Sequence, residues 1–177
     1  MDHPTLAELF RQDAVSHFDE YLPRIVRCLQ LLSKREIWWR PNASSNAAGN
    51  IVLHLCGNIR QWIIAGLSGA ADNRERDKEF AERGPVSRRA LIARLKNTVK
   101  EARTIIAALP DDALVREFGI QGYAVSGQTA ISHVYEHFSY HAGQIIYLTK
   151  MKRGKDLRFT RLPAIKPSGK PQADRRP

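Results

Sequence analysis

The chain has 177 residues, of which 43% are hydrophobic and 26% are charged, an ordinary balance for a globular domain with a sizeable core. Its apolar runs are short and its first ten residues carry no basic cluster, so we expect neither a membrane span nor a secretory signal peptide. Cys28 and Cys56 lack a C-x-x-C spacing and point to core thiols in a reducing cytoplasm.

The net charge of +10 is unevenly distributed. Residues 152–177 hold nine Lys or Arg against two Asp, whereas the preceding 151 residues hold nineteen against sixteen acids. The terminal segment also contains four prolines and few apolar residues, which predicts disorder. We therefore expect a globular part over residues 1–155 and a basic, Pro-rich tail over residues 156–177. Weak contact of the tail with nucleic acid is one interpretation, and a solubilising role is the simpler one.

Residues 4–33 predict a long amphipathic helix, because their apolar residues recur at spacings of three and four. Pro23 lies inside this pattern and is expected to kink or split the helix. Trp38 and Trp39 follow in a connection, where we expect them to cover one end of a helical bundle. Residues 42–46 then offer several N-caps for a second helix over residues 47–67.

The second predicted helix carries an unusual polar stripe opposite its apolar face. Asn50, His54 and Asn58 recur at four-residue spacing, and Gln61 lies beside them. A solvated helix face is normally rich in Lys and Glu, and this stripe contains neither. The stripe therefore predicts an inward-facing polar site, with His54 as a metal ligand and the three amides around it.

The rest of the chain predicts two more long helices. Residues 70–86 form a charged connection with room for one helical turn, and Ser87 caps a third helix that runs to Leu109. Residues 113–126 contain too much Gly for a helix and predict a short extended or irregular segment. Ser126 caps the last helix, to about residue 151. Four such segments predict an all-α, antiparallel four-helix bundle, in which sites are built between facing helices.

Three histidines lie on the last helix, at positions 133, 137 and 141. His137 and His141 are one turn apart and can bind the same ion, whereas His133 lies about 80° from His141 and is expected at the edge of the site. Gln144 continues the face and could orient a ligand or a substrate. Three neutral imidazoles with no carboxylate favour Zn, Ni or Fe(II), and three protein ligands leave an open position, as in catalytic sites.

Two alternatives compete with this interpretation. The histidines could instead pack and hydrogen-bond in a helical core. His133, Glu136 and His137 also match the inverted-zincin pattern H-x-x-E-H, which requires a further ligand, usually Glu, from a later helix. After Glu136 the only acids are Asp156 and Asp174, both in the basic terminal region, so a peptidase is the weaker hypothesis.

One His on the second helix, followed by His-x-x-x-His and then Gly-Gln on the last, resembles the DinB-like superfamily of helical proteins. The residues that carry the pattern here are His54, His137, His141, Gly143 and Gln144. Residues 45–62 and 73–80 look like one uncharacterised bacterial branch, and the resemblance covers residues 5–152. It implies an up-down-down-up bundle, often a homodimer, with a divalent metal on the three histidines.

The resemblance also suggests an activity, because some members are S-transferases that use bacillithiol, mycothiol or glutathione, and others are isomerases or hydrolases. The leading hypothesis is a metal-dependent enzyme that transfers a low-molecular-weight thiol to a small electrophile, which His133, Tyr135 or Gln144 would position. The alternative is a non-catalytic metal-binding or stress-response protein. In this branch the stretch 72–80 is expected over the pocket, with Arg74 and Arg76 as substrate contacts.

Overall fold

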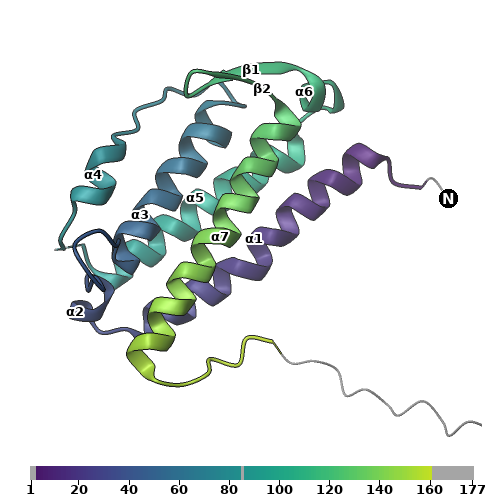
Figure 1. Ribbon diagram of the computed structural model, residues 1–177. Helices are drawn as coiled ribbons and strands as arrows, with labels where there is room; N and C mark the ends of the chain where they lie inside the picture. The colour runs from purple at the N-terminus through teal and green to yellow at the C-terminus, as the bar shows by residue number, and fades with distance from the viewer. Residues whose placement is uncertain (1–2, 85, 161–177) are drawn as a thin grey trace, which may run out of the picture.

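The computed structural model describes residues 3–84 and 86–160 and is predominantly helical (Figure 1). Its long elements are α1 (Leu6–Leu31), α3 (Ala48–Ile59), which continues into the π-helical segment η1 (Arg60–Ala65), α5 (Arg88–Ala108) and α7 (Gly127–Arg153). Its short elements are α2 (Lys34–Ile37), α4 (Arg76–Ala81), α6 (Asp111–Val115) and the strands β1 (Glu117–Ile120) and β2 (Tyr123–Ser126). The mostly helical class expected from the sequence is confirmed.

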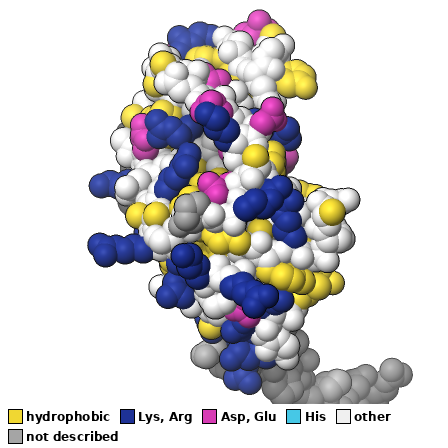
Figure 2. Space-filling model, turned by 90° about the vertical axis from the view of Figure 1, so that its left-hand side faces the viewer, with side chains coloured by type: hydrophobic (Ala, Val, Ile, Leu, Met, Phe, Trp, Pro, Cys, Tyr) yellow, Lys and Arg dark blue, Asp and Glu magenta, His cyan; other side chains and the backbone are white. Residues whose placement is uncertain are grey.

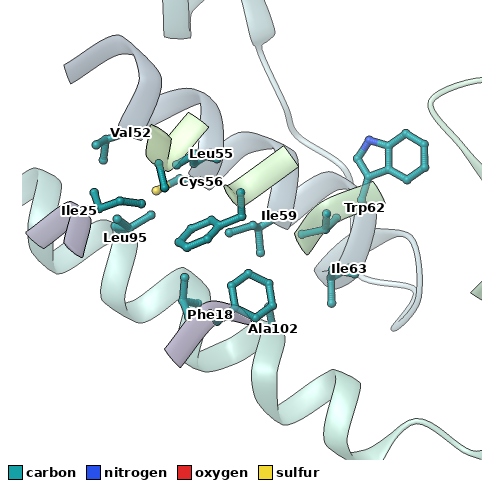
Figure 3. Close-up of a cluster of buried hydrophobic side chains, with 14 of the residues drawn as sticks. Phe18, Ile25, Val52, Leu55, Cys56, Ile59, Trp62, Ile63, Leu95 and Ala102 are labelled. Atoms are coloured by element: carbon teal, nitrogen blue, oxygen red, sulfur yellow. The ribbon is translucent and has the colours of Figure 1, made fainter. Parts of the chain in front are cut away.

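The long helices lie side by side and enclose one hydrophobic core. Helices α1 and α3 each pack against both α5 and α7. Figure 3 shows part of the core, to which α1 contributes Phe18 and Ile25, α3 contributes Leu55 and Ile59, and α5 contributes Leu95. Each of these side chains is almost fully buried. The packing places the inner faces of α3 and α7 against each other, and this is where the candidate site lies.

The helix ends follow the expected capping chemistry with one exception. The Ser87 and Ser126 hydroxyls accept hydrogen bonds from the N–H groups of Ala90 and Thr129, as predicted for the starts of α5 and α7. The expectation for the second helix was wrong, because none of residues 42–46 caps it. Its N-cap is Ala47, and the Ala47 N–H donates to a side-chain oxygen inside the helix, Asn50 Oδ1, at 3.3 Å.

Pro23 does not split α1, which is a single helix from Leu6 to Leu31. Proline removes the hydrogen bond that its missing N–H would have donated to the carbonyl of Asp19. Asp19 is exposed, so water can satisfy the freed carbonyl. The cost of Pro23 is thereby small enough for the apolar face of α1 to keep the helix continuous.

The extended segment predicted before the last helix is an antiparallel hairpin of β1 and β2, paired from Glu117 with Ser126 to Ile120 with Tyr123. Its two turn residues, Gln121 and Gly122, both have positive φ, of 54° and 83°. This is the geometry of a type I′ turn, which suits the twist of a two-residue hairpin.

The globular part extends beyond the predicted boundary at residue 155, because Leu157 is buried in the core. The disorder expected for the tail falls mainly on residues 161–177, which lie outside the described part of the chain. None of the helices in the described part of the chain is both long enough and apolar enough to span a lipid bilayer.

Both cysteines are free and buried, as predicted. Burial raises the pKa of the Cys56 thiol to about 11 and also raises the pKa of Cys28. Both therefore stay protonated at neutral pH and act as small apolar side chains.

Candidate metal centre

Three histidines converge between α3 and α7. Helix α3 brings His54, and α7 brings His137 and His141, so that one ring nitrogen of each lies within 4.8 Å of the others. His54 Nε2 and His137 Nε2 are 2.9 Å apart. Two imidazole nitrogens on one tetrahedral zinc ion, at about 2.0–2.1 Å each, would be roughly 3.3 Å apart, which a small ring rotation would provide. The group could therefore hold a metal ion.

The protonation states of the two α7 histidines suit metal binding. Burial, and then the nearby imidazoles, lower the pKa of His137 to about 3. Burial lowers the pKa of His141 to about 4. Both rings are therefore neutral at physiological pH, and each keeps one nitrogen lone pair for a ligand.

His54 is held by a buried carboxylate from α4. Its Nδ1 lies 3.0 Å from Glu79 Oε2, and Glu79 is only 8% exposed. Burial by itself would raise the pKa of Glu79, but hydrogen bonds from His54 and Arg74 and the charge of Arg74 bring it below its usual value. Glu79 is therefore ionised and accepts the Nδ1–H, which leaves the Nε2 lone pair of His54 directed at the other two histidines.

Arg74 completes this support. Its Nε and Nη2 donate to Glu79 Oε1 and Oε2 at 2.9 and 3.0 Å, and its Nη1 donates to Gln61 Oε1 at 2.9 Å. Nη2 also lies 3.1 Å from His54 Nδ1, and we assign its proton to Glu79 because the carboxylate is the stronger acceptor. The Arg74 side chain is 5% exposed and is occupied by protein partners, so the structure places it in the support of His54 rather than at a free substrate-binding surface.

The support fits because α3 has a glycine where it approaches α4. A Cβ atom on Gly57 would lie 1.8 Å from Glu79 Oε1 and 2.9 Å from Arg74 Nε. One turn beyond His54 toward the start of α3, Asn50 Nδ2 donates to the carbonyls of Glu79 and Glu82, both at 2.9 Å. The polar stripe predicted on this helix therefore does face inward, and Asn50 anchors the backbone of α4 rather than a histidine ring.

The α7 side of the site uses neutral partners. His141 Nδ1 lies 2.8 Å from Gln144 Oε1, which makes Gln144 an orienting partner of this ring. His133 lies at the edge, as expected. Its Nε2 is 3.2 Å from Asn58 Nδ2, and its ring lies 4.0 Å from that of Trp62 on η1. Asn58 Oδ1 is buried and has no hydrogen-bond partner within the described residues.

The structure does not bring every predicted residue to the histidine group. Tyr135 stacks on His17 of α1 with ring centroids 4.6 Å apart, about 200° around α7 from His137. Arg76 is exposed, and its guanidinium lies 5.0 Å from the centre of the Phe80 ring. Glu136, the base required by the inverted-zincin alternative, is also exposed.

Sequence reasoning missed the carboxylate of Glu79, since the residues predicted around the three histidine ligands included amides and arginines but no acid. It also missed Phe80, whose ring lies 4.7 Å from the ring of His54. Both residues come from a stretch whose composition indicates a solvated loop. One signal was present in the sequence: Gly57 interrupts an apolar helix, and such a glycine often marks close approach of another segment.

The helical fold of this chain is similar to that of a protein described as DinB-like. A crystal structure described as a DinB-like protein (YjoA) of Bacillus subtilis has a TM-score of 0.60 and 20% sequence identity, over 79% of this chain and 92% of that chain, so the two share a fold. Residues 5–166 match the family described as "Protein of unknown function (DUF1572)", and the chain belongs to this family. No curated protein matches the chain. The resemblance predicted from the histidine pattern is confirmed.

Proposed function

We propose that the chain binds one divalent transition metal, Zn, Ni or Fe(II), through Nε2 of His54, His137 and His141. The observation that carries the proposal is the convergence of three ring nitrogens within 4.8 Å, from two different helices. The hydrogen bonds on the Nδ1 atoms of His54 and His141 support it, because metal-binding histidines commonly use the second nitrogen in this way.

We infer further that the site is catalytic. Three protein ligands leave at least one coordination position for a substrate, unlike the closed ligand set of a structural metal. When bound, such a metal would lower the pKa of a thiol or a water so that it can attack at neutral pH. The chain itself supplies rings that stay neutral and a buried amide oxygen, Asn58 Oδ1, that is free to accept a hydrogen bond from a ligand.

The reaction that we propose is transfer of a low-molecular-weight thiol to a small electrophile. The thiol releases its proton to solvent and its sulfur forms a bond to the electrophilic carbon. The bond between that carbon and the leaving group breaks, and the leaving group departs into solvent with the electron pair. His133 is suited to hold the electrophile at the edge of the site, because it lies beside the Trp62 ring and Asn58. A non-catalytic metal-binding role is the alternative.

Metal content, measured by mass spectrometry on the purified protein, tests the first step. We expect close to one equivalent in the wild type and its loss in His54→Ala, His137→Ala and His141→Ala. Glu136→Ala, an exposed change on the same helix, should keep the metal. Loss in Glu136→Ala and His133→Ala with retention in the other variants would contradict this ligand set.

A thiol-transfer screen on the loaded protein tests the second step. Bacillithiol, mycothiol and glutathione are each offered with a panel of small electrophiles, and thiol consumption is followed. Turnover that disappears in His137→Ala would support an enzyme. A fully loaded protein without turnover would favour the non-catalytic alternative.

The antiparallel four-helix bundle remains a prediction from the four amphipathic segments. Its up-down-down-up order and the assembly into a homodimer remain predictions from the resemblance. Light scattering coupled to size-exclusion chromatography checks the dimer.

A further inference from the structure

One end of the molecule carries a strongly basic surface that the metal site does not use. Two open hollows lie there, of about 700 and 460 Å³. Among the described residues, their lining includes seven Lys or Arg side chains and no acidic side chain: Lys34, Arg35, Arg40, Arg83, Arg88, Arg89 and Lys96. We refer to these seven residues, together with Trp39, as the basic end. Figure 2, which views the α4 side of the molecule, shows Lys and Arg side chains over the whole of that face and few acidic side chains in its lower half.

The two hollows belong to one continuous region, because hydrogen bonds tie their walls together. Trp38 Nε1 donates to the carbonyl of Val86 at 3.3 Å, which joins the end of α2 to the segment before α5. Arg88 Nη1 donates to the carbonyls of Gln30 and Leu32, both at 3.2 Å, which joins the start of α5 to the end of α1. The segments that carry the cations of the two hollows are therefore joined to neighbouring segments by hydrogen bonds.

The charge of this surface is not a consequence of overall composition. A third hollow of about 330 Å³, beside α4, is lined by four cations and four acids: Arg60, Arg74, Lys78, Arg94, Asp72, Glu75, Glu79 and Glu82. Near the basic end the acids have partners of their own. Glu36 pairs with Arg153, and Glu82 Oε1 accepts from the backbone N–H groups of Arg83 and Gly84. Among the seven cations, Arg40, Arg83 and Arg88 also donate to oxygen atoms of the protein. The exposed side chains of Lys34, Arg35, Arg89 and Lys96 are left to face a ligand.

We propose that the basic end binds single-stranded nucleic acid. A row of Lys and Arg side chains suits a repeated phosphate backbone, and open hollows suit an extended polymer better than an enclosed small molecule. Trp39 is half-buried, lines the larger hollow and has Lys152 Nζ 3.7 Å from its ring centre. A partly exposed indole among cations is a stacking platform for an unpaired base, which duplexes do not offer.

An anionic membrane is the competing partner, and the distribution of apolar residues argues against it. Peripheral membrane binding adds inserted apolar side chains to the charge attraction. The large apolar side chains that are most exposed among the described residues are Leu6, Leu9, Val115, Tyr123, Tyr140, Tyr147 and Met151, and none of them lines either hollow.

Fluorescence anisotropy with a labelled 20-nucleotide oligo(dT), on the full-length protein over a series of salt concentrations, tests the proposal. We expect salt-dependent binding that weakens by at least about tenfold when Lys34, Arg35 and Arg89 are changed to Glu. Trp39→Ala should weaken binding by about fivefold or more. The matched control changes Arg60, Lys100 and Arg116 to Glu, since these exposed cations lie elsewhere and give the same net charge. It should alter affinity less than about threefold.

Four results would overturn the proposal. The first is absence of salt-dependent binding by the wild type. The second is an equal loss of affinity in the control triple variant, which would indicate attraction by net charge alone. The third is tighter binding to vesicles containing phosphatidylserine than to the oligonucleotide. A full-length variant with the five basic residues of segment 161–177 changed to Gln measures the contribution of that segment to binding. The proposal would also be overturned if this variant lost all binding while the basic-end triple variant bound as tightly as the wild type.

Discussion

The histidine rings on the two sides of the site are both held through Nδ1, on one side by a charged partner and on the other by a neutral partner. On the α3 side, Nδ1 of His54 is held by the buried carboxylate of Glu79, which Arg74 pairs in turn. On the α7 side, Nδ1 of His141 is held by the neutral amide of Gln144, three residues further along the same helix. The first support joins separate segments of the chain, whereas the second is local.

This difference predicts how each side responds to change. A buried ion pair has given up its hydration, so removing one partner leaves an uncompensated charge. A neutral amide on a helix surface has lost little hydration, so its replacement changes the free energy of unfolding only slightly. Loss of the support on the α3 side should therefore reduce both metal binding and folding stability, whereas loss of the support on the α7 side should reduce mainly metal binding.

The largest effect is expected from Glu79→Ala. The change leaves the Arg74 guanidinium buried without its carboxylate, so we expect a loss of about 3–5 kcal/mol in the free energy of unfolding, measured by urea denaturation. Metal affinity, measured by chelator competition, should fall about 10–100-fold because Nδ1 of His54 loses its acceptor. Glu79→Ala combined with Arg74→Met should cost less than the sum of the two single changes. A loss below about 1 kcal/mol for Glu79→Ala would contradict a tightly held pair.

Gly57→Ala should disrupt the same support without removing a charged group. The new Cβ would lie 1.8 Å from Glu79 Oε1, so the carboxylate must move away from His54. We expect a loss of about 1–3 kcal/mol in unfolding free energy, although alanine is the better helix former.

The matched control for this change is Gly143→Ala on α7. Gly143 is exposed, and a Cβ there would meet no atom within 4 Å. Alanine should therefore stabilise the protein by roughly 0.5–1 kcal/mol through helix propensity alone. Stabilisation by both Gly57→Ala and Gly143→Ala would show that the contact between α3 and α4 does not require a glycine at position 57.

These residues also show where sequence-based prediction stopped. His54, His137 and His141 could be predicted because helical spacing places each of them on a defined face, and facing helices then bring them together. Glu79 could not, because its position depends on the path of a charged connection that has no periodic pattern. Its contact with Arg74 spans five residues, which is not a helical spacing, so no local rule indicates the pair.

The absence of a split at Pro23 and the position of Tyr135 away from the histidine group have physical reasons of the same kind. Proline weakens a helix locally, but the cost depends on whether the freed carbonyl reaches water, which the fold decides. Tyr135 lies close to His133 and His137 in sequence, but two residues along a helix turn a side chain to the opposite face, where α1 supplies His17 as its partner.

Acid should destabilise the metal-free protein through the α7 histidines. Burial lowers the folded-state pKa of His137 to about 3 and of His141 to about 4, whereas the unfolded chain titrates near 6.5. The unfolded state therefore binds more protons below pH 6.5, and stability falls as the pH drops from about 6.5 toward 4. The slope is at most about 1.4 kcal/mol per pH unit for each ring, and less because both rings are only partly buried.

Urea denaturation of chelator-treated protein at pH 7.5, 6.5, 5.5 and 4.5 measures this slope. His137→Leu, which cannot take up a proton, should flatten the profile, and His3→Leu in the same assay should leave it unchanged. Stability that is constant from pH 6.5 to 4.5 in the wild type would indicate that the rings ionise without penalty.

The smallest effect is expected from Gln144→Leu, which removes the neutral support of His141. The side chain is only partly buried and bonds within its own helix, so unfolding free energy should change by less than about 1 kcal/mol. Metal affinity should still fall, by about tenfold, because the ring loses the acceptor that fixes its tautomer. Gln128→Leu, an exposed change in the first turn of α7, is the control for both measurements. A loss of stability as large as that of Glu79→Ala would remove the distinction between the two sides, since a local neutral bond would then matter as much to the fold as a buried ion pair between separate segments.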